Sequence, residues 1–323
     1  MQFTADIIDT LGNRFKEIII PIPKSPATKQ ELTTKMSTAI EIRTKYKAAI
    51  KQMPILIENV LDTNSTTLFD TFFSKSIEEM LIDLVQDTTT LEFGDFSAYM
   101  LRSDAIKNNI LLPKYYDPSI SLVLKNLSNN CILKSVRELI DEGSLELATG
   151  DEIGKAAYGT GDIPFVRTSD FSNWEIKADA KQGVSEEIYE IYAEREDIQA
   201  GDILLVRDGT YLVGTSCIIT ECDTKMLYCG GLIKLRSKNK ELLNEYLLLG
   251  LLNSYIVKRQ IRTKQFTRDV IDTLGQRLKE VVLPIPTSLE IKTQIAEKVH
   301  SIVHNRIEAR EIITQLSNDI IAQ

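Results

Sequence analysis

The chain has 323 residues and a mass of 36.5 kDa, enough for two or three domains with a sizeable core. Its composition is typical of a soluble globular protein, and no apolar run reaches the ~20 residues that cross a bilayer. Charges at Asp6, Asp9 and Arg14 interrupt any signal peptide, so we expect a cytoplasmic protein. The net charge of −8 argues against a protein that coats nucleic acid without specificity.

One phrase occurs twice in the chain. QFTADIIDTLGNRFKEIIIPIP occupies residues 2–23 and QFTRDVIDTLGQRLKEVVLPIP occupies residues 265–286, with 15 of 22 positions identical. A duplication of this kind indicates structural pseudo-symmetry. The apolar run before each PIP predicts a short buried strand, and the prolines predict its end because proline has no backbone N–H.

A long helix with a coiled-coil seam is predicted after each copy. Apolar residues recur at steps of four and three, the spacing of a heptad seam, and one arginine interrupts each series at the equivalent position. The series are Leu32, Met36, Ala39, Arg43, Tyr46, Ile50 and Met53, and Ile295, Val299, Ile302, Arg306, Ala309, Ile313, Leu316 and Ile320. We expect the two seams to pair with each other or with the helices of a second chain.

Between these helices the pattern changes twice. Residues 54–112 are mostly helical in pattern, with breaks at Asn64–Ser65 and near Gly94. From Pro113 onward, short β-branched runs separated by glycine-containing turns predict strands. The strand-like segments are 162–168, 202–220 and 227–236, and 241–261 has the pattern of one long apolar-faced helix.

The cysteines and histidines give no sign of a metal site. The four cysteines form no CxxC pair, so we expect free thiols rather than a zinc ribbon. His300 and His304 are spaced as i and i+4 on the second long helix, but no third ligand is near them in the sequence. Two solvated histidines are the simpler interpretation, and we predict no metal and no cofactor.

Basic residues are concentrated between Lys258 and Lys279. Seven lysines and arginines lie in this stretch with two acids, Asp269 and Asp272. A local basic patch on an acidic protein favours a focused contact with a polyanion. A solvated helix with scattered charge is the alternative.

The order of these segments resembles a target recognition domain of the specificity (S) subunit of type I restriction–modification enzymes. The resemblance rests on SLELATGDEIGKAAYGTGDIPFVRTSDFSNWEI, GDILLVRDGTYLVGTS, EYLLLGLLNSYIVKRQI and LKEVVLPIP in that order, with LLPKYYDP before them. It covers residues 113–323, and residues 1–53 through the repeat.

The family implies an architecture and a set of partners. Its members carry two recognition domains, each of which reads one half of a bipartite site on double-stranded DNA, and two antiparallel helices that set the spacing. The S subunit holds methyltransferase (M) subunits, which modify adenine, and a motor-nuclease (R) subunit joins the complex. The S subunit has no catalytic residue of its own.

This sequence contains one recognition domain rather than two. We expect an α+β protein in which this domain is flanked by long coiled-coil-forming helices, with an extra helical segment near the N-terminus. A second recognition domain would come from a homodimer through the spacer helices or from another chain of a split system; a remnant is the third possibility. The expected segments are 1–23 (tail of a recognition domain), 24–53 (first spacer helix), 54–112 (helical segment), 113–286 (target recognition domain) and 287–323 (second spacer helix).

The resemblance places DNA contacts in three loops and in the basic stretch. Arginine and lysine suit phosphates or guanine, and the hydroxyls of serine and threonine suit phosphates. The candidate residues are Thr149, Lys155, Arg167, Thr168, Ser169, Arg207, Thr210, Lys258, Arg259, Arg262 and Lys264. For Arg167 and Arg207 the alternative is a surface salt bridge. The residues from Lys258 to Lys264 could contact the methyltransferase instead.

Two other classes of function stay open. A metal-dependent nuclease could use Asp162, Glu175 and Lys177, which have the right residue types for a Mg²⁺ site. A non-catalytic assembly protein would use the coiled coil alone. A methyltransferase is disfavoured because Asp117–Pro118 is followed by serine instead of the Pro-aromatic pair that this chemistry requires.

Overall fold

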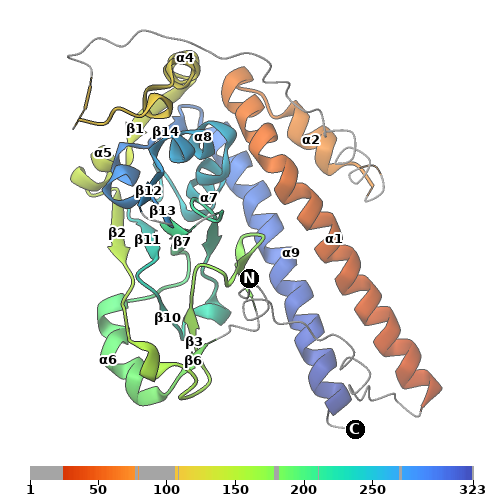
Figure 1. Ribbon diagram of the computed structural model, residues 1–323. Helices are drawn as coiled ribbons and strands as arrows, with labels where there is room; N and C mark the ends of the chain where they lie inside the picture. Colours follow the sequence, from red (N-terminus) through yellow and green to blue (C-terminus); the bar gives the residue numbers. More distant parts are fainter. Residues whose placement is uncertain are drawn as a thin grey trace, which may run out of the picture. The chain divides into compact units, whose positions relative to one another are not determined.

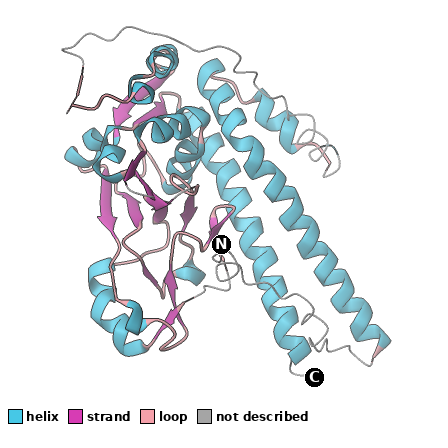
Figure 2. Ribbon diagram, in the orientation of Figure 1, coloured by secondary structure: helices cyan, strands magenta, loops and turns pink. Residues whose placement is uncertain are grey.

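The computed structural model describes residues 25–76, 79, 106–107, 109–177, 182–209, 211–268 and 271–321. It combines two long helices with short strands and short helices (Figures 1 and 2), which confirms the predicted α+β class. The described chain falls into two compact units, one of residues up to Arg43 together with those from Asn305 on, the other of Thr44–His304. The N-terminal copy of the repeat and the predicted break near Gly94 lie outside the described residues.

The first long helix, α1 (Pro26–Thr63), is longer than expected. The sequence predicted its end at Met53, but the helix continues through Pro54. Proline inside a helix costs ~3 kcal/mol because it removes a hydrogen bond and crowds the preceding turn. The buried face continues beyond it, with Ile57 and Val60 fully buried, and this burial offsets the cost. The helix then stops at Asn64, whose φ of 53° ends it where the sequence placed a break.

Burial along α1 and α9 (Leu289–Ile321) follows the predicted seams. Within the smaller unit the two helices run side by side in opposite directions (Figure 1). Arg306 is 2% exposed, so the polar interruption of the second seam is a buried side chain, while Arg43 is half-buried. The fully or almost fully buried seam residues are Ala39, Met53, Ile295, Val299, Ile302, Ala309 and Leu316.

The predicted recognition domain contains several small sheets. The largest has the order β2–β11–β7–β9, and a three-stranded sheet has the order β10–β3–β6. Their strands are β2 (Leu145–Thr149), β11 (Leu232–Ser237), β7 (Ile203–Val206), β9 (Ser216–Ile218), β10 (Leu227–Tyr228), β3 (Ile163–Val166) and β6 (Gly183–Val184). The remaining strands are β1 (Cys131–Ser135) with β14 (Val282–Pro286), β4 (Phe171–Ser172) with β5 (Glu175–Ile176), and β12 (Phe266–Arg268) with β13 (Ile271–Thr273) and β8 (Asp208–Gly209).

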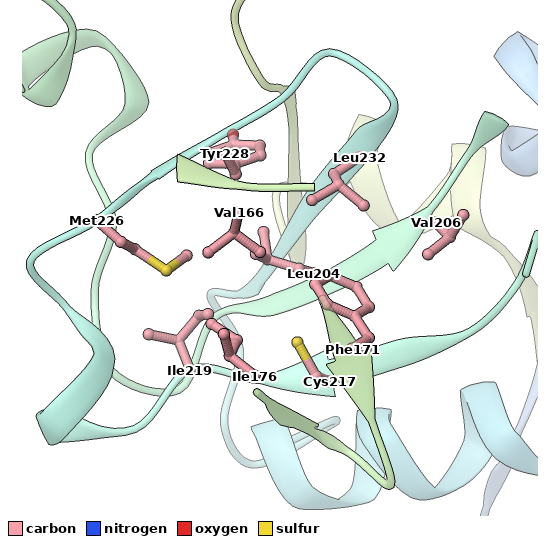
Figure 3. Close-up of a cluster of buried hydrophobic side chains, with 10 residues drawn as sticks. All are labelled: Val166, Phe171, Ile176, Leu204, Val206, Cys217, Ile219, Met226, Tyr228 and Leu232. Atoms are coloured by element: carbon pink, nitrogen blue, oxygen red, sulfur yellow. The ribbon is translucent and has the colours of Figure 1, made fainter. Parts of the chain in front are cut away.

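One hydrophobic cluster joins these sheets (Figure 3). Leu204 and Leu232 come from the four-stranded sheet, Val166 and Tyr228 from the three-stranded sheet, and Phe171 from the β4–β5 hairpin. Because side chains of neighbouring sheets share one core, the loops that leave these strands have fixed positions relative to one another.

Several short helices and 3₁₀ turns accompany the sheets. They are α2 (Thr67–Phe73), α4 (Pro118–Leu127), α5 (Val136–Asp141), α6 (Glu186–Glu196), α7 (Glu245–Asn253) and α8 (Tyr255–Lys264), with 3₁₀ turns η3 (Pro113–Tyr116), η4 (Lys155–Ala157), η5 (Glu221–Asp223) and η6 (Gly275–Glu280). In the part of the chain that the structure describes, no helix has the length and apolar character needed to cross a bilayer.

The single helix predicted for 241–261 is in fact two, α7 and α8. Ser254 lies between them with φ −63° and ψ 154°, an extended conformation. Its hydroxyl donates to the carbonyl of Leu251 at 2.7 Å. The side-chain amide of Asn253 donates to Ser216 Oγ and to the carbonyl of Leu249. These side-chain bonds compete with helix continuation, as is typical of serine and asparagine.

The prediction that PIP ends regular structure is wrong for the C-terminal copy. β14 includes Pro284 and Pro286, and it pairs with β1 in an antiparallel register. The N–H of Val136 donates to Val281 and that of Thr287 to Asn130, so the hydrogen-bonded positions of β14 are the odd-numbered ones. Both prolines fall between them, where the missing N–H would point away from β1.

Gly250 of α7 packs directly against the two long helices within the larger unit. A Cβ atom at this position would lie 3.2 Å from Val299, 3.3 Å from Ile295 and 3.4 Å from Ile57. Glycine therefore lets α7 approach both α1 and α9 closely.

We predict that Gly250→Leu lowers the free energy of unfolding by ~1–3 kcal/mol through overpacking. Urea unfolding followed by circular dichroism measures the change. Glu187→Leu, at an exposed position of α6, serves as the control and should shift the value by no more than about 0.5 kcal/mol. Equal stability of the wild type and Gly250→Leu would contradict the close packing.

Candidate nucleic-acid interface

Three loop segments meet at the turn Gly230–Gly231 between β10 and β11. β2 and β7 are both antiparallel to β11, so Thr149 and Arg207 leave the sheet at the same edge. The N–H of Arg207 donates to the carbonyl of Gly231 at 2.9 Å. The N–H of Cys229 donates at 3.0 Å to the carbonyl of Val166, which precedes Arg167 in the third loop. We call the residues around this turn the glycine-turn surface: 149–158, 167–170, 207–209 and 229–231.

The glycines at this surface allow the backbones to approach. A Cβ atom on Gly150 would lie 2.3 Å from the carbonyl oxygen of Tyr228, and one on Gly230 would lie 2.6 Å from Glu152 Oε1. A Cβ atom on Gly231 would be 3.0 Å from the methyl group of Thr168. The first of these contacts involves backbone and cannot relax easily, so Gly150 is required for the three loops to meet.

Arg167 is the exposed arginine of the glycine-turn surface. Its backbone N–H donates to the buried carboxylate of Asp170 at 2.8 Å, which holds the loop. Its guanidinium lies 5.9 Å from the ring centre of Tyr158. Among the residues that the structure describes, this guanidinium has no ion pair, so it is available to a ligand. Thr168 and Ser169 follow in the same turn, where the ammonium group of Lys177 donates to the Ser169 carbonyl at 2.6 Å.

Arg207 is restrained by its neighbour. Its guanidinium donates to Asp208 Oδ2 from Nε at 2.8 Å and from a terminal nitrogen at 2.6 Å. Asp208 in turn accepts a hydrogen bond from the hydroxyl of Thr273 at 2.6 Å. The salt bridge that the sequence left open as an alternative is therefore present at Arg207. Thr210 lies outside the described residues.

Thr149 and Lys155 complete the surface. Thr149 is the exposed last residue of β2, and Lys155 is exposed in η4. Hydroxyl and ammonium groups at the edge of a loop cluster can hold phosphate oxygens.

Two residues of the basic stretch form internal contacts instead. Arg259 pairs with Asp117 at 2.9 Å and also donates to the hydroxyl of Ser119, at the start of α4. Lys264 pairs with Glu280 at 3.1 Å, and its ammonium group lies 4.5 Å from the ring centre of Tyr115. Both side chains thus attach α8 to neighbouring segments. Lys258 and Arg262, on the same helix, line a cavity that also includes Tyr211.

A buried charge network supports the glycine-turn surface, and the sequence did not reveal it. Glu196, 2% exposed, accepts the N–H of Tyr228 at 2.9 Å and that of Asp151 at 3.3 Å. Burial raises the pKa of Glu196 to about 8. Arg236 pairs with the buried Asp202 at 2.7 Å. The residues of this network lie up to 45 positions apart, so no local pattern could have found them.

The remaining candidates from the sequence are a metal site, the cysteines and the two histidines. No cluster of three or more histidine, cysteine or acidic side chains that could hold a metal occurs within the described ranges. The prediction of free cysteines is confirmed for all four. His300 and His304 are both exposed, and their rings stack 5.9 Å apart.

An α+β domain that gathers arginine, lysine and hydroxyl groups at one edge fits a domain that recognises nucleic acid. The family model of the type I restriction modification DNA specificity domain matches residues 136–318. This range is more than half of the chain, so the chain belongs to that family, as the resemblance had implied.

The chain is similar to several solved structures, three of which follow, and no curated protein matches it. The S subunit of a type I restriction–modification system from M. genitalium is 11% identical, with a TM-score of 0.46. A protein studied for the complex assembly and conformational transition of the type I R-M system is 14% identical, with a TM-score of 0.39. The HsdS subunit from Thermoanaerobacter tengcongensis is 14% identical, with a TM-score of 0.38. These matches cover 92%, 93% and 92% of this chain, but the chain spans only 58%, 58% and 56% of theirs.

We predict that Glu196 makes the protein less stable as the pH rises. Its pKa in the folded state is raised above the ordinary 4.5, so its contribution is complete below that value and is lost as the pH approaches about 8. Between about pH 5 and pH 8 the wild type should lose up to ~1.4 kcal/mol of unfolding free energy per pH unit relative to Glu196→Gln. Urea unfolding at several pH values provides the comparison, and parallel pH profiles for the two proteins would contradict the assignment.

Proposed function

We propose that the chain is a DNA-binding specificity subunit of a type I restriction–modification complex, in which its domain reads one half of a bipartite double-stranded DNA site. The observation that carries this proposal is the convergence of three loops at Gly230–Gly231. It places an exposed arginine beside hydroxyl and ammonium groups at one sheet edge, within the range that the family model matches. Base-edge readout and phosphate positioning need these residue types together.

The residues of the glycine-turn surface take different roles in this proposal. Arg167 reads a base edge, because its guanidinium is exposed and has no ion pair among the described residues. Thr149, Lys155, Thr168 and Ser169 hold phosphates. Arg207 is already bound to Asp208, so it reads DNA only if that ion pair opens.

The two long helices connect the recognition domain to the rest of the complex in this proposal. We propose that 113–286 is the recognition domain and that the first and second spacer helices, α1 and α9, carry it. Residues 54–63 of the expected 54–112 segment belong to α1, and α2 lies in the segment after them. Methyltransferase subunits that act on adenine, and a motor-nuclease subunit, supply the catalysis in the cytoplasm. A second recognition domain, outside the sequence printed here, reads the other half-site.

We predict that Arg167→Ala weakens specific DNA binding by ~1–3 kcal/mol and relaxes sequence preference at one position. Duplexes are first selected from a random library with the wild-type protein, and their affinities are then measured by gel shift with competitor DNA. Arg137→Ala, at an exposed position of α5, is the matched control and should bind as the wild type does. Unchanged affinity and preference in Arg167→Ala would remove Arg167 from the interface.

The effect of salt separates readout from phosphate contacts. Loss of a phosphate contact at Lys155 should reduce the slope of log affinity against log salt by about one, whereas Arg167→Ala should leave more of that slope intact. The same gel shifts at several salt concentrations measure both slopes. Failure to select any duplex with the wild-type protein would favour the assembly protein over the specificity subunit.

A further inference from the structure

A cavity of about 520 Å³ opens beside α8, outside the glycine-turn surface as defined above. Its volume lies within the ~300–1,000 Å³ of small-molecule sites. Lys258 and Arg262 come from α8, Trp174 from the β4–β5 turn and Asn253 from the end of α7. Tyr211 and Gln265 line it as well.

Two cations lie in this cavity without an anion. Across the described residues, neither Lys258 nor Arg262 has an ion pair or a side-chain hydrogen bond. Burial, and then the charge of Arg262, lower the pKa of Lys258. A half-buried ammonium group beside a second cation is costly, and a bound anion would relieve that cost.

An exposed aromatic ring stands at the same cavity. Tyr211 is 93% exposed, although tyrosine usually buries much of its ring. An exposed ring next to cations is the arrangement on which single nucleotides stack. Asn253 donates its amide hydrogens to Ser216 and Leu249, so only its carbonyl oxygen remains to accept from a ligand.

The turn that carries Trp174 is held in an uncommon conformation. Asn173 and Trp174 have φ values of 51° and 68°, and they connect β4 to β5 as a two-residue hairpin loop. Glycine is the usual residue at the second position of such a loop, so tryptophan there is strained. The N–H of Ile218 donates to the Trp174 carbonyl at 3.2 Å and helps to hold it.

We propose that this cavity binds a nucleotide, with the phosphate between Lys258 and Arg262 and the base against Tyr211. Two cations match the charge of a phosphate monoester, about −1.5 to −2 near pH 7. A carboxylate side chain from a partner protein would occupy little of the volume, which disfavours an acidic protein segment. The nucleotide is either a free monophosphate or one unstacked nucleotide of DNA; both present a base and a phosphate, and the phosphodiester of DNA carries a single negative charge. This inference concerns other residues than the proposed readout and does not depend on it.

The tryptophan makes the test direct, because Trp174 is the only one in the chain and lines the cavity. Deoxyadenosine 5′-monophosphate and the three other deoxynucleoside monophosphates are titrated at constant ionic strength while tryptophan fluorescence is recorded. At least one should change the signal saturably. Deoxyadenosine and inorganic phosphate should each bind at least about tenfold more weakly, since each lacks one half of the contact.

Substitutions test which residues bind the phosphate. Lys258→Gln and Arg262→Gln should each weaken the monophosphate at least about tenfold, because each loses a charged hydrogen bond. Lys125→Gln, at an exposed position of α4, is the control and should bind as the wild type does. Circular dichroism confirms that the variants fold. Monophosphate affinity equal to that of inorganic phosphate, or unchanged in both variants, would overturn the proposal.

Competition separates the two sources of nucleotide. Displacement of the monophosphate by a single-stranded oligonucleotide supports a nucleotide of DNA, and its absence supports a free nucleotide. Loss of methyltransferase binding in Lys258→Gln, with no nucleotide response in the wild type, would replace the proposal with a protein contact. The gel shifts with Arg167→Ala test the readout separately, so failure of one proposal leaves the other measurable.

Discussion

The loops of the recognition domain meet because the backbones around Gly150 and Gly230–Gly231 approach one another closely. A side chain at Gly150 would overlap the carbonyl of Tyr228, so the ends of β2 and β10 can meet only without one. The same turn accepts the N–H of Arg207 and lies beside β3. Loops from four strands are thereby fixed to one edge, and a shared core beneath them keeps that edge rigid (Figure 3).

The cations of the domain fall into two groups, those with internal partners and those available to a ligand. Two buried cations of the domain have internal partners: Arg236 pairs with Asp202, and Lys234 donates to the backbone carbonyls of Glu196 and Asp197. An unpaired buried charge is expensive, so these contacts stabilise the interior. Arg167 at the glycine-turn surface has no such ion pair among the described residues. The contrast between satisfied and available cations separates the residues that support the fold from those that can meet a ligand.

The long helices and several strands could be predicted from the sequence because each depends on a pattern of neighbouring residues. The seams of α1 and α9 depend on steps of four and three, and Arg306 proved to be buried within its series. The strands around Arg167 and Arg207 also follow local patterns. Contacts between distant segments could not be predicted. For example, Arg259 and Asp117, which form an ion pair, lie 142 residues apart. The break at Ser254 was missed because two side-chain hydrogen bonds, one to distant Ser216, outweigh a continuous apolar face.

Mapping of methylated adenines tests whether one surface of this chain reads half of a bipartite DNA site. The chain is expressed with methyltransferase subunits, and methylated adenines are located across a genome for the wild type and for Arg167→Ala. We predict a split recognition sequence of two half-sites with fixed spacing, in which Arg167→Ala relaxes a half-site. Methylation at an undivided motif, or a split motif that Arg167→Ala leaves unchanged while other substitutions at this surface also have no effect, would contradict it.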